Sequence, residues 1–314
     1  MKLTNDDFLG DLELCANEYF KHIIALSYSN NTISLYKRII FQFLIYSSNF
    51  QEKMCIKNIK TAYIVNFLDF LEKNSKNANV LSKKTKNTYL RVISSFFNFI
   101  SENNDNLYNF SFNFSKLKLK TNKAEEKLSY LNENEEKRLI LYLDREKSKK
   151  NTYNAFRNSF LIKLMLYAGL RISEALNVKL DDFSLENENM FKISIIGKGI
   201  KEQYAYIKKD LIEDELEYFY EHIKTNELIM KTKNNAKLDR SSAFIIINRI
   251  YTKAFIKKQG LHLLRHTLAM RLTEKGVNLV VIQKILRHTD IKTTTIYAKA
   301  TTKSIDEALS LAVK

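Results

Sequence analysis

Apolar side chains recur every three or four positions along most of this chain, which is the period of an amphipathic helix. In the N-terminal third the pattern predicts four such helices, at Phe8–Ser27, Ile33–Ser48, Asn58–Glu72 and Lys83–Ser101. Helices of this kind can bury their apolar faces against one another, so we expect a helical domain over residues 1–115.

The period is lost after this segment, where the chain becomes polar and rich in lysine. A stretch without apolar periodicity has little to bury, so residues 116–131 are predicted to form an extended basic linker between domains. Lys118 and Lys120 in this linker are candidate phosphate contacts. Lysines also gather beside hydroxyl groups at the first turn of the fourth helix, where a solvated helix face is the alternative interpretation. These lysines are Lys83, Lys84 and Lys86.

Helical periodicity returns at Asn132–Glu146 and Asn154–Ala168, which begin a second domain over residues 132–314. Within it, Met190–Ile196 and Lys201–Ile207 are rich in β-branched and aromatic residues and flank a glycine-containing turn. Such a pair predicts a β-hairpin. The expected fold is therefore mainly α with a small antiparallel β-sheet.

Composition narrows the functional class. The 314 residues carry a formal net charge of +16, which indicates a polyanionic partner, although a general abundance of Lys, Asn and Ile would also raise the charge. Cys15 and Cys55 are too few for a disulfide framework or a metal knuckle, which favours a reducing compartment. No signal-peptide core or membrane-length apolar run is present, so we expect a soluble, cytoplasmic protein.

Chemically active side chains are concentrated between Gly260 and Tyr297. His262 and Arg265 are three residues apart, so on a helix they project from the same side, beside an apolar stripe of leucines that would bury that helix. A second short apolar segment ends at His288, nine residues before Tyr297. Two imidazoles, a guanidinium and a phenol in this arrangement suit binding an anion and attacking it.

A second guanidinium enters upstream, at the start of a predicted helix. Glu174 stands one turn after Arg171, where its carboxylate can accept hydrogen bonds from the guanidinium and hold its orientation. An ordinary surface pair is the alternative for two residues at this spacing.

Together these segments resemble the tyrosine recombinase family. The resemblance rests on five ordered elements, namely A-G-L-R-I-S-E at 168–174, G-K-G at 197–199, H-x-L-R-H-T at 262–267, L-x-H at 286–288 and T-x-x-x-Y at 293–297. It implies a helical core-binding domain followed by a DNA breaking and rejoining catalytic domain. Tyr297 would be the nucleophile that forms a 3′-phosphotyrosine, and Lys198 would protonate the departing 5′ oxygen. The other catalytic residues implied are Arg171, His262, Arg265 and His288, without a cofactor or metal ion.

The resemblance also implies partners. These are double-stranded DNA with an inverted-repeat core site, and three further copies of the chain that complete a homo-tetramer on two duplexes. The final amphipathic segment, Ser304–Val313, would pack on a neighbouring subunit. Length and layout look most like the Xer recombinases that resolve chromosome dimers, and an integrase of a mobile element is the alternative. A partner recombinase and an activating DNA translocase are left open.

Three other interpretations compete. His262, His266 and His288 could bind a metal ion, but Leu263 stands where a zinc protease needs its glutamate, and neighbouring arginines would repel a cation. A type IB topoisomerase uses similar chemistry but resembles this chain order less. A DNA-binding module without catalysis is disfavoured because all the expected residue types are present.

One position departs from the family pattern, because Arg287 stands where a glycine usually precedes the histidine of L-x-H. If that position is a left-handed helix cap, arginine would strain the turn or shift His288. Arg287 could instead supply an additional phosphate contact.

Overall fold

The structure of this chain is a computed structural model that describes residues 1–4, 6–50, 54–74, 81–110, 112, 117, 129–196 and 202–288. The chain divides into two compact units, Met1–Glu126 and Lys127–Lys314, each with its own hydrophobic core. Most of the predicted linker lies outside the described residues, as do Lys118, Lys120, Lys198, Tyr297 and the segment Ser304–Val313.

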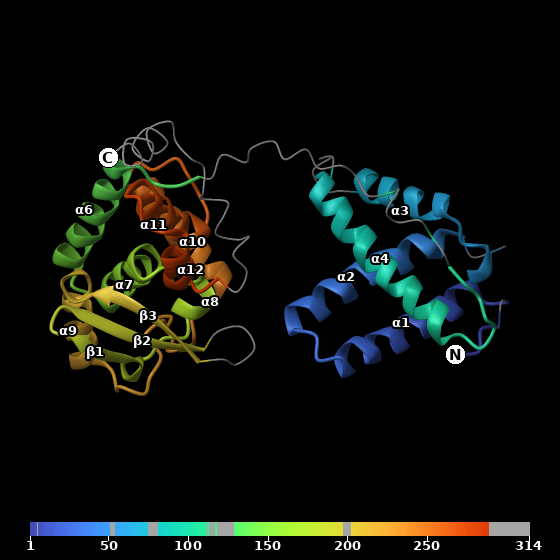
Figure 1. Cartoon of the computed structure of the whole chain (residues 1–314), viewed down its shortest axis with the longest axis horizontal. Coiled ribbons are helices and arrows are strands. Elements are labelled where there is room, and N and C mark those ends of the chain that lie inside the picture. The colour runs from blue at the N-terminus through green and yellow to red at the C-terminus, as the bar shows by residue number, and fades with distance from the viewer. Residues whose placement is uncertain are drawn as a thin grey trace, which may run out of the picture. The chain divides into compact units, whose positions relative to one another are not determined.

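The first unit is built from helices α1 (Phe8–Ala25), α2 (Asn30–Ser47), α3 (Thr61–Lys73) and α4 (Lys83–Asn103), with α4 crossing α1 and α2 (Figure 1). These are the four helices that the periodicity predicts. The predicted start of α2, Ile33, was wrong by three residues, since the helix begins at Asn30. The Ser29 hydroxyl accepts a hydrogen bond from the Thr32 N–H and caps the helix at this earlier position.

Aromatic rings fill the core of the first unit. Phe43 is fully buried, and the rings of Tyr63, Phe67 and Phe97 all meet it edge-on, with centroids 5.1–5.9 Å away. Edge-to-face pairs add to the burial energy of each ring, so this cluster fixes α2, α3 and α4 together.

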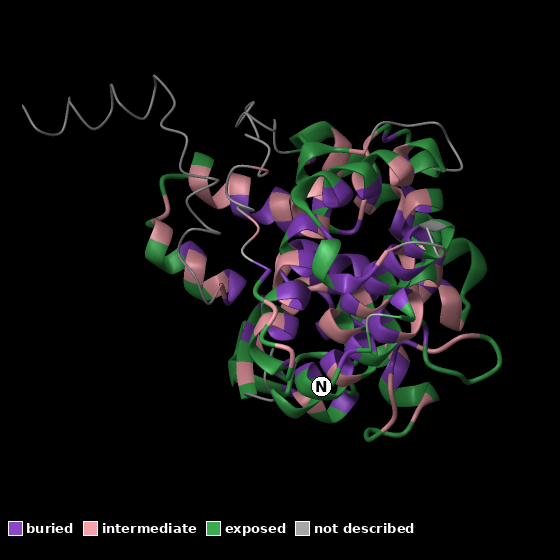
Figure 2. Ribbon diagram, turned by 90° about the vertical axis from the view of Figure 1, so that its right-hand side faces the viewer, coloured by how far each residue is buried: buried purple, intermediate pink, exposed green. Residues whose placement is uncertain are grey.

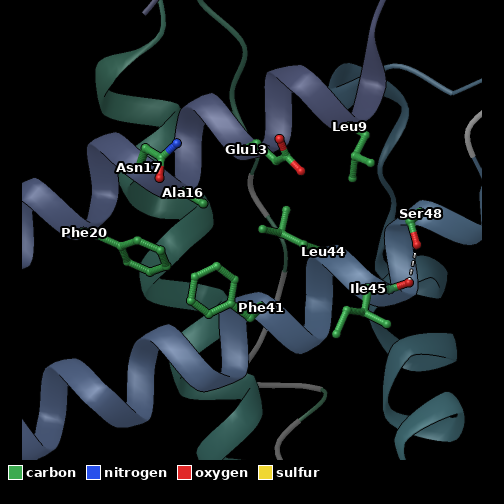
Figure 3. Close-up of a pocket in the computed structure, with 9 residues that line it drawn as sticks. All are labelled: Leu9, Glu13, Ala16, Asn17, Phe20, Phe41, Leu44, Ile45 and Ser48. Atoms are coloured by element: carbon green, nitrogen blue, oxygen red, sulfur yellow. Dashed lines mark hydrogen bonds between the residues drawn. The ribbon is translucent and has the colours of Figure 1, made fainter.

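A shallow apolar hollow of about 560 Å³ lies between α1 and α2. Figure 3 shows Phe20 and Phe41 facing each other across it, with ring centroids 5.6 Å apart. Glu13 is its charged lining residue and no lysine, arginine or histidine lines it, so this hollow has no group suited to an anion.

The second unit is organised around α7 (Tyr153–Tyr167), which is buried along most of its length, while α6 (Glu133–Lys150) and α11 (His262–Glu274) pack against it (Figure 1). Buried residues lie along the inner faces of the helices and exposed residues along their outer faces (Figure 2). The other helices among the described residues of this unit are α8 (Ile172–Ala175), α9 (Glu213–His222), α10 (Arg240–Lys253) and α12 (Leu279–Leu286).

A three-stranded antiparallel sheet completes the second unit, in the order β1 (Phe183–Asn187), β2 (Met190–Ile196) and β3 (Glu202–Lys208). The predicted hairpin is β2 and β3, whose register pairs Met190 with Lys208. No strand is predicted from the sequence at β1, because its alternation of apolar and polar residues is short, from Phe183 to Glu186, and only Phe183 of its five residues is buried.

A buried carboxylate joins three helices of this unit. Glu215 on α9 is fully buried, and its carboxylate accepts from the Ser159 hydroxyl at 2.6 Å. The ammonium groups of Lys147 and Lys163 both lie 2.8 Å from the same carboxylate. A buried charge is stable only when it is paired, so this cluster fixes α9 against α6 and α7. Among the described residues no helix is long and apolar enough to cross a membrane.

Gly169, which ends α7, has φ +60° and a closely packed surrounding. A Cβ there would lie 3.0 Å from Leu268 Cδ2 and 3.1 Å from Leu286 Cδ2. Gly276 has φ +73° but no atom within 4 Å of the same position, so it is a matched control.

We expect Gly276→Ala to lower the free energy of unfolding by about 1 kcal/mol, because of backbone strain. Gly169→Ala should lower it by about 1–3 kcal/mol more, because two leucines must also move. Urea unfolding midpoints test this, and equal losses would contradict it.

Candidate active site

The candidate site forms where the ends of α7 and α12 meet α8 and the first turns of α11 (Figure 1). After α7 ends, the Leu170 N–H donates back to the Leu164 carbonyl at 3.2 Å, which closes a tight turn at Gly169. Arg171 follows in an extended conformation as the N-cap of α8. The turn therefore delivers the Arg171 side chain to the start of a new helix.

Glu174 holds Arg171 in the way its spacing predicts. One carboxylate oxygen, Oε1, accepts from Arg171 Nη1 at 2.6 Å, and the other, Oε2, accepts from the Arg171 backbone N–H at 2.8 Å. Arg171 Nη2 donates to the Arg287 carbonyl at 3.0 Å. The Arg171 side chain remains 36% exposed, so its guanidinium is held in place and still open to solvent.

Arg265 is buried, and two backbone carbonyls hold it. Its Nη1 donates to the Gly169 carbonyl and its Nη2 to the Leu286 carbonyl. One carbonyl belongs to the turn after α7 and the other to the last turn of α12. The fork of this guanidinium therefore joins three elements at one point. Of the predicted leucine stripe, Leu261, Leu264 and Leu268 are buried, and Leu272 at its far end is partly buried.

Arg287 occupies a left-handed position, with φ 53° and ψ 46°, as the C-cap of α12. Its side chain is 4% exposed and turns inward, which stands against the alternative that it contacts a phosphate. Its Nη2 donates to Glu174 Oε2 at 3.0 Å and to the Gly169 carbonyl at 2.9 Å, and Nη1 donates to the Ile285 carbonyl at 2.8 Å.

Glu174 is thus shared by two guanidinium groups. Burial by itself raises the pKa of the Glu174 carboxyl, but Arg287, the Arg171 backbone N–H and the Arg171 guanidinium together outweigh burial, so the pKa is lowered. The carboxylate is charged when both arginines are in place.

Three imidazoles lie beside these cations. Burial first, and then Arg265, Arg171, Arg287 and His266, together lower the pKa of His288 to about 4. The pKa values of His262 and His266 are also lowered, in each case first by burial. In the free protein these rings are neutral at neutral pH, so each can accept or donate one proton.

His262 is the first residue of α11 and borders a second hollow of about 480 Å³. Arg240, which starts α10, lines the same hollow and is one of the cations that lower the pKa of His262. Arg240 is not among the predicted site residues, and its local signal in the sequence is the Asp239 cap that places it at a helix start. The other lining residues are Ser241, Phe244, Ile245, Gly260 and Leu261.

The site's charge suits an anion. Arg171 and Arg287 both pair with Glu174, and the Gly169 and Leu286 carbonyls hold Arg265 beside them, so three guanidinium groups gather next to neutral imidazoles. In the part of the chain that the structure describes, no group of three or more His, Cys, Asp or Glu side chains is arranged to hold a metal ion.

The structure brings together five of the predicted site residues. Arg171, Glu174, Arg265, His262 and His288 lie together, whereas the predicted lysines of α4 belong to the first unit. Two of these lysines, Lys83 and Lys84, are exposed. Lys86 instead pairs with Glu72 of α3 at 2.7 Å, so it is the least available for a phosphate.

The chain is similar in sequence and in fold to known proteins. Residues 129–304 match the phage integrase family. The chain is 32% identical to tyrosine recombinase XerD of Rickettsia bellii, over 90% of this chain and 92% of that protein. It is similar to the crystal structure of XerH bound to its difH substrate, with a TM-score of 0.74, 25% identity, and coverage of 98% of this chain and 84% of that one. The Tn1549 transposon integrase, in complex with a circular intermediate DNA, has the same fold, with a TM-score of 0.68 and 18% identity over 96% of this chain and 99% of that one.

The lowered histidine pKa values generate a pH prediction. A histidine whose pKa is lower in the folded than in the unfolded state contributes stability above its unfolded pKa, and this stability is lost as pH falls toward the folded value. For His288 that window runs from about 6.5, the usual value, down to about 4. We expect the melting temperature of the DNA-free protein to fall across this window.

His288→Asn should reduce that fall, because an amide does not titrate. His222→Asn, an exposed position on α9, is the matched control. Thermal melts at half-unit pH steps measure both variants. Identical pH profiles for His288→Asn and the wild type would contradict the assignment.

Proposed function

The chain belongs to the phage integrase family as a tyrosine recombinase of the Xer type, and from this premise we propose that it cuts and rejoins DNA at a specific site to resolve chromosome dimers. The observation that carries the proposal is the pair of guanidinium groups, Arg171 and Arg265, held by Glu174 and by the Gly169 and Leu286 carbonyls beside neutral His288. Tyrosine recombinases are enzymes that cleave and rejoin DNA.

The proposed reaction exchanges one phosphate ester for another. Attack on a phosphodiester builds negative charge on its non-bridging oxygens, so fixed guanidinium donors stabilise the transition state more than the ground state. Each such donor contributes about two to three powers of ten in rate. Lysine would serve less well, because its ammonium lacks the planar fork.

The bonds balance without a further reactant. The Tyr297 oxygen forms a bond to phosphorus, and the bond from phosphorus to the 5′ oxygen breaks, giving a 3′-phosphotyrosine and a free 5′ hydroxyl. His262 or His288 accepts the phenol proton, and Lys198 supplies a proton to the departing oxygen. Rejoining reverses these steps on a new 5′ hydroxyl. Positive side chains fill the role that metal ions play in many other phosphoryl-transfer sites.

The domain layout is part of the proposal. Residues 1–115 would form the core-binding domain, 116–131 the basic linker and 132–314 the catalytic domain. Lys83 and Lys84 are exposed on the first turn of α4, in support of their proposed phosphate contacts. Lys118 and Lys120 would extend these contacts along the linker.

An integrase of a mobile element is the second candidate, since it would use the same chemistry, and the shared fold of the Tn1549 integrase favours it. The two candidates differ in their DNA. A chromosomal inverted-repeat site that supports exchange between two circles indicates dimer resolution, whereas exchange only at the ends of an element indicates integration. Relaxation of supercoils without any exchange would indicate a topoisomerase.

Tyr297→Phe tests the chemistry. We expect it to abolish covalent trapping on a nicked suicide substrate, because only the nucleophilic oxygen is lost, while site binding stays within about threefold of wild type. Denaturing gels measure the covalent complex and gel shifts measure binding. The reactions contain excess EDTA, in which the wild type should still react.

Tyr220→Phe, an exposed tyrosine on α9, is the matched control and should trap DNA normally. A covalent complex formed by Tyr297→Phe would remove this residue as the nucleophile. Loss of wild-type activity in EDTA with recovery in zinc would replace the proposal with the metal site at His262, His266 and His288.

Truncation after Lys303 tests the proposed tetramer. The segment beyond it carries a small apolar stripe, Ile305, Ala308, Leu309 and Ala312, seven residues past Tyr297. A stripe of this area forms only a weak contact, so we expect docking on a neighbouring subunit to occur on DNA. The truncated protein should bind one site normally but lose pairing of two sites and strand exchange. Recombination at the wild-type rate would reduce the segment to a local lid.

A further inference from the structure

Arg287 has a role that the proposed reaction does not use. Its side chain is almost fully buried, yet it carries a charge that, in the described part of the chain, Glu174 alone balances. Glu174 already pairs with Arg171, so one carboxylate serves two guanidinium groups. An apolar residue would fill the same space without burying a charge, so the position of Arg287 calls for an explanation beyond packing.

Hydrogen bonds connect Arg287 indirectly to both proposed catalytic arginines, the partly exposed Arg171 and the buried Arg265. Its Nη2 donates to Glu174 Oε2, whose partner oxygen Oε1 holds Arg171. The same nitrogen donates to the Gly169 carbonyl, which also accepts from Arg265. A single intervening group therefore connects Arg287 to each of the other guanidinium groups: the Glu174 carboxylate to that of Arg171, and the Gly169 carbonyl to that of Arg265.

The backbone of Arg287 adds a third connection. Its carbonyl accepts from Arg171 Nη2 at 3.0 Å, and the following residue is His288. Gln283 fixes His288 on both sides, because the His288 N–H donates to the Gln283 carbonyl and Gln283 Nε2 donates to the His288 carbonyl, each at 3.1 Å. The left-handed cap at Arg287 therefore sets the direction of the Arg287 carbonyl and of His288.

We propose that Arg287 is a positioning residue that, from behind the anion site, fixes Arg171 through Glu174 and Arg265 through the Gly169 carbonyl. It does not contact the substrate, since its guanidinium is enclosed by the carbonyls of Ala168, Gly169 and Ile285 and by Glu174. The inference rests on the proposed function. It predicts that Arg287 affects the rate of the chemical step and leaves DNA binding unchanged.

The test is Arg287→Gly in the full chain. Glycine accepts the positive φ without strain, so the cap is kept while the guanidinium is removed. We expect the single-turnover cleavage rate at saturating protein to fall about 10- to 100-fold, the size of a small misplacement of catalytic groups. The dissociation constant for a single site should stay within about threefold, since no phosphate contact is lost. Arg287→Lys, which keeps a charge for Glu174 but cannot form the fork, should fall between the two.

Arg271→Ala is the matched control. Arg271 also joins two elements through an ion pair, with Glu136 of α6, and it lies outside the site. It should keep the wild-type cleavage rate even if its melting temperature falls as far as that of Arg287→Gly. A cleavage rate that follows melting temperature across both variants would show a structural role only and overturn the proposal.

A double-variant cycle tests the route through Glu174. Because Arg287 acts partly through this carboxylate, the combined loss in Glu174→Gln with Arg287→Gly should be smaller than the product of the single losses. A combined loss equal to that product would overturn the route. A wild-type protein that forms no covalent complex refutes the proposed function instead, whereas equal cleavage by wild type and Arg287→Gly refutes only the positioning role.

Discussion

Buried guanidinium groups need acceptors for their donors, and this requirement shapes the second unit, where among the described residues Arg287 Nε is the guanidinium nitrogen that stays buried without a hydrogen-bond partner. Arg265 and Arg287 both lie inside the protein, where an unpaired polar group is unfavourable by several kcal/mol. The available acceptors are carbonyls at the ends of helices, which have no partner within their own helix. Gly169, Ile285 and Leu286 supply them, so the ends of α7 and α12 are drawn to the same two side chains.

The same arrangement prepares the site for an anion before any anion is present. Burial, and after it the positive charge of Arg265, Arg171 and Arg287, lowers the pKa of His288 to about 4, so this imidazole is neutral at neutral pH. In the proposed reaction, an entering phosphate would offset the positive charge of these guanidinium groups. Donors held by backbone carbonyls do not need to reorganise during the reaction, and fixed donors of this kind are the most effective at stabilising developing charge.

The fold of this chain is shared by proteins that differ widely in sequence. The fold is shared with the Tn1549 transposon integrase at 18% identity and with the XerH site-specific recombinase at 25% identity. The same fold therefore occurs in a transposon integrase and in a site-specific recombinase. The proposed catalytic residues all belong to the second unit, whereas helices of the first unit carry exposed lysines and an aromatic core. We infer that site choice depends on surfaces outside the catalytic cluster.

Periodicity alone determined most elements of this protein, because helices that bury one face must repeat apolar residues every three or four positions. Local spacing also predicted the contact between Arg171 and Glu174, which are one turn apart. Strand β1 was not predicted, because its alternation of apolar and polar residues is short and its second apolar residue, Leu185, is exposed. The partners of Arg265 and Arg287 could not be read from the sequence, since Gly169 and Glu174 lie about a hundred residues away. Whether Arg287 faces DNA or the interior was decided only by the tertiary structure, because the left-handed cap directs its side chain toward carbonyls that the fold brings beside it.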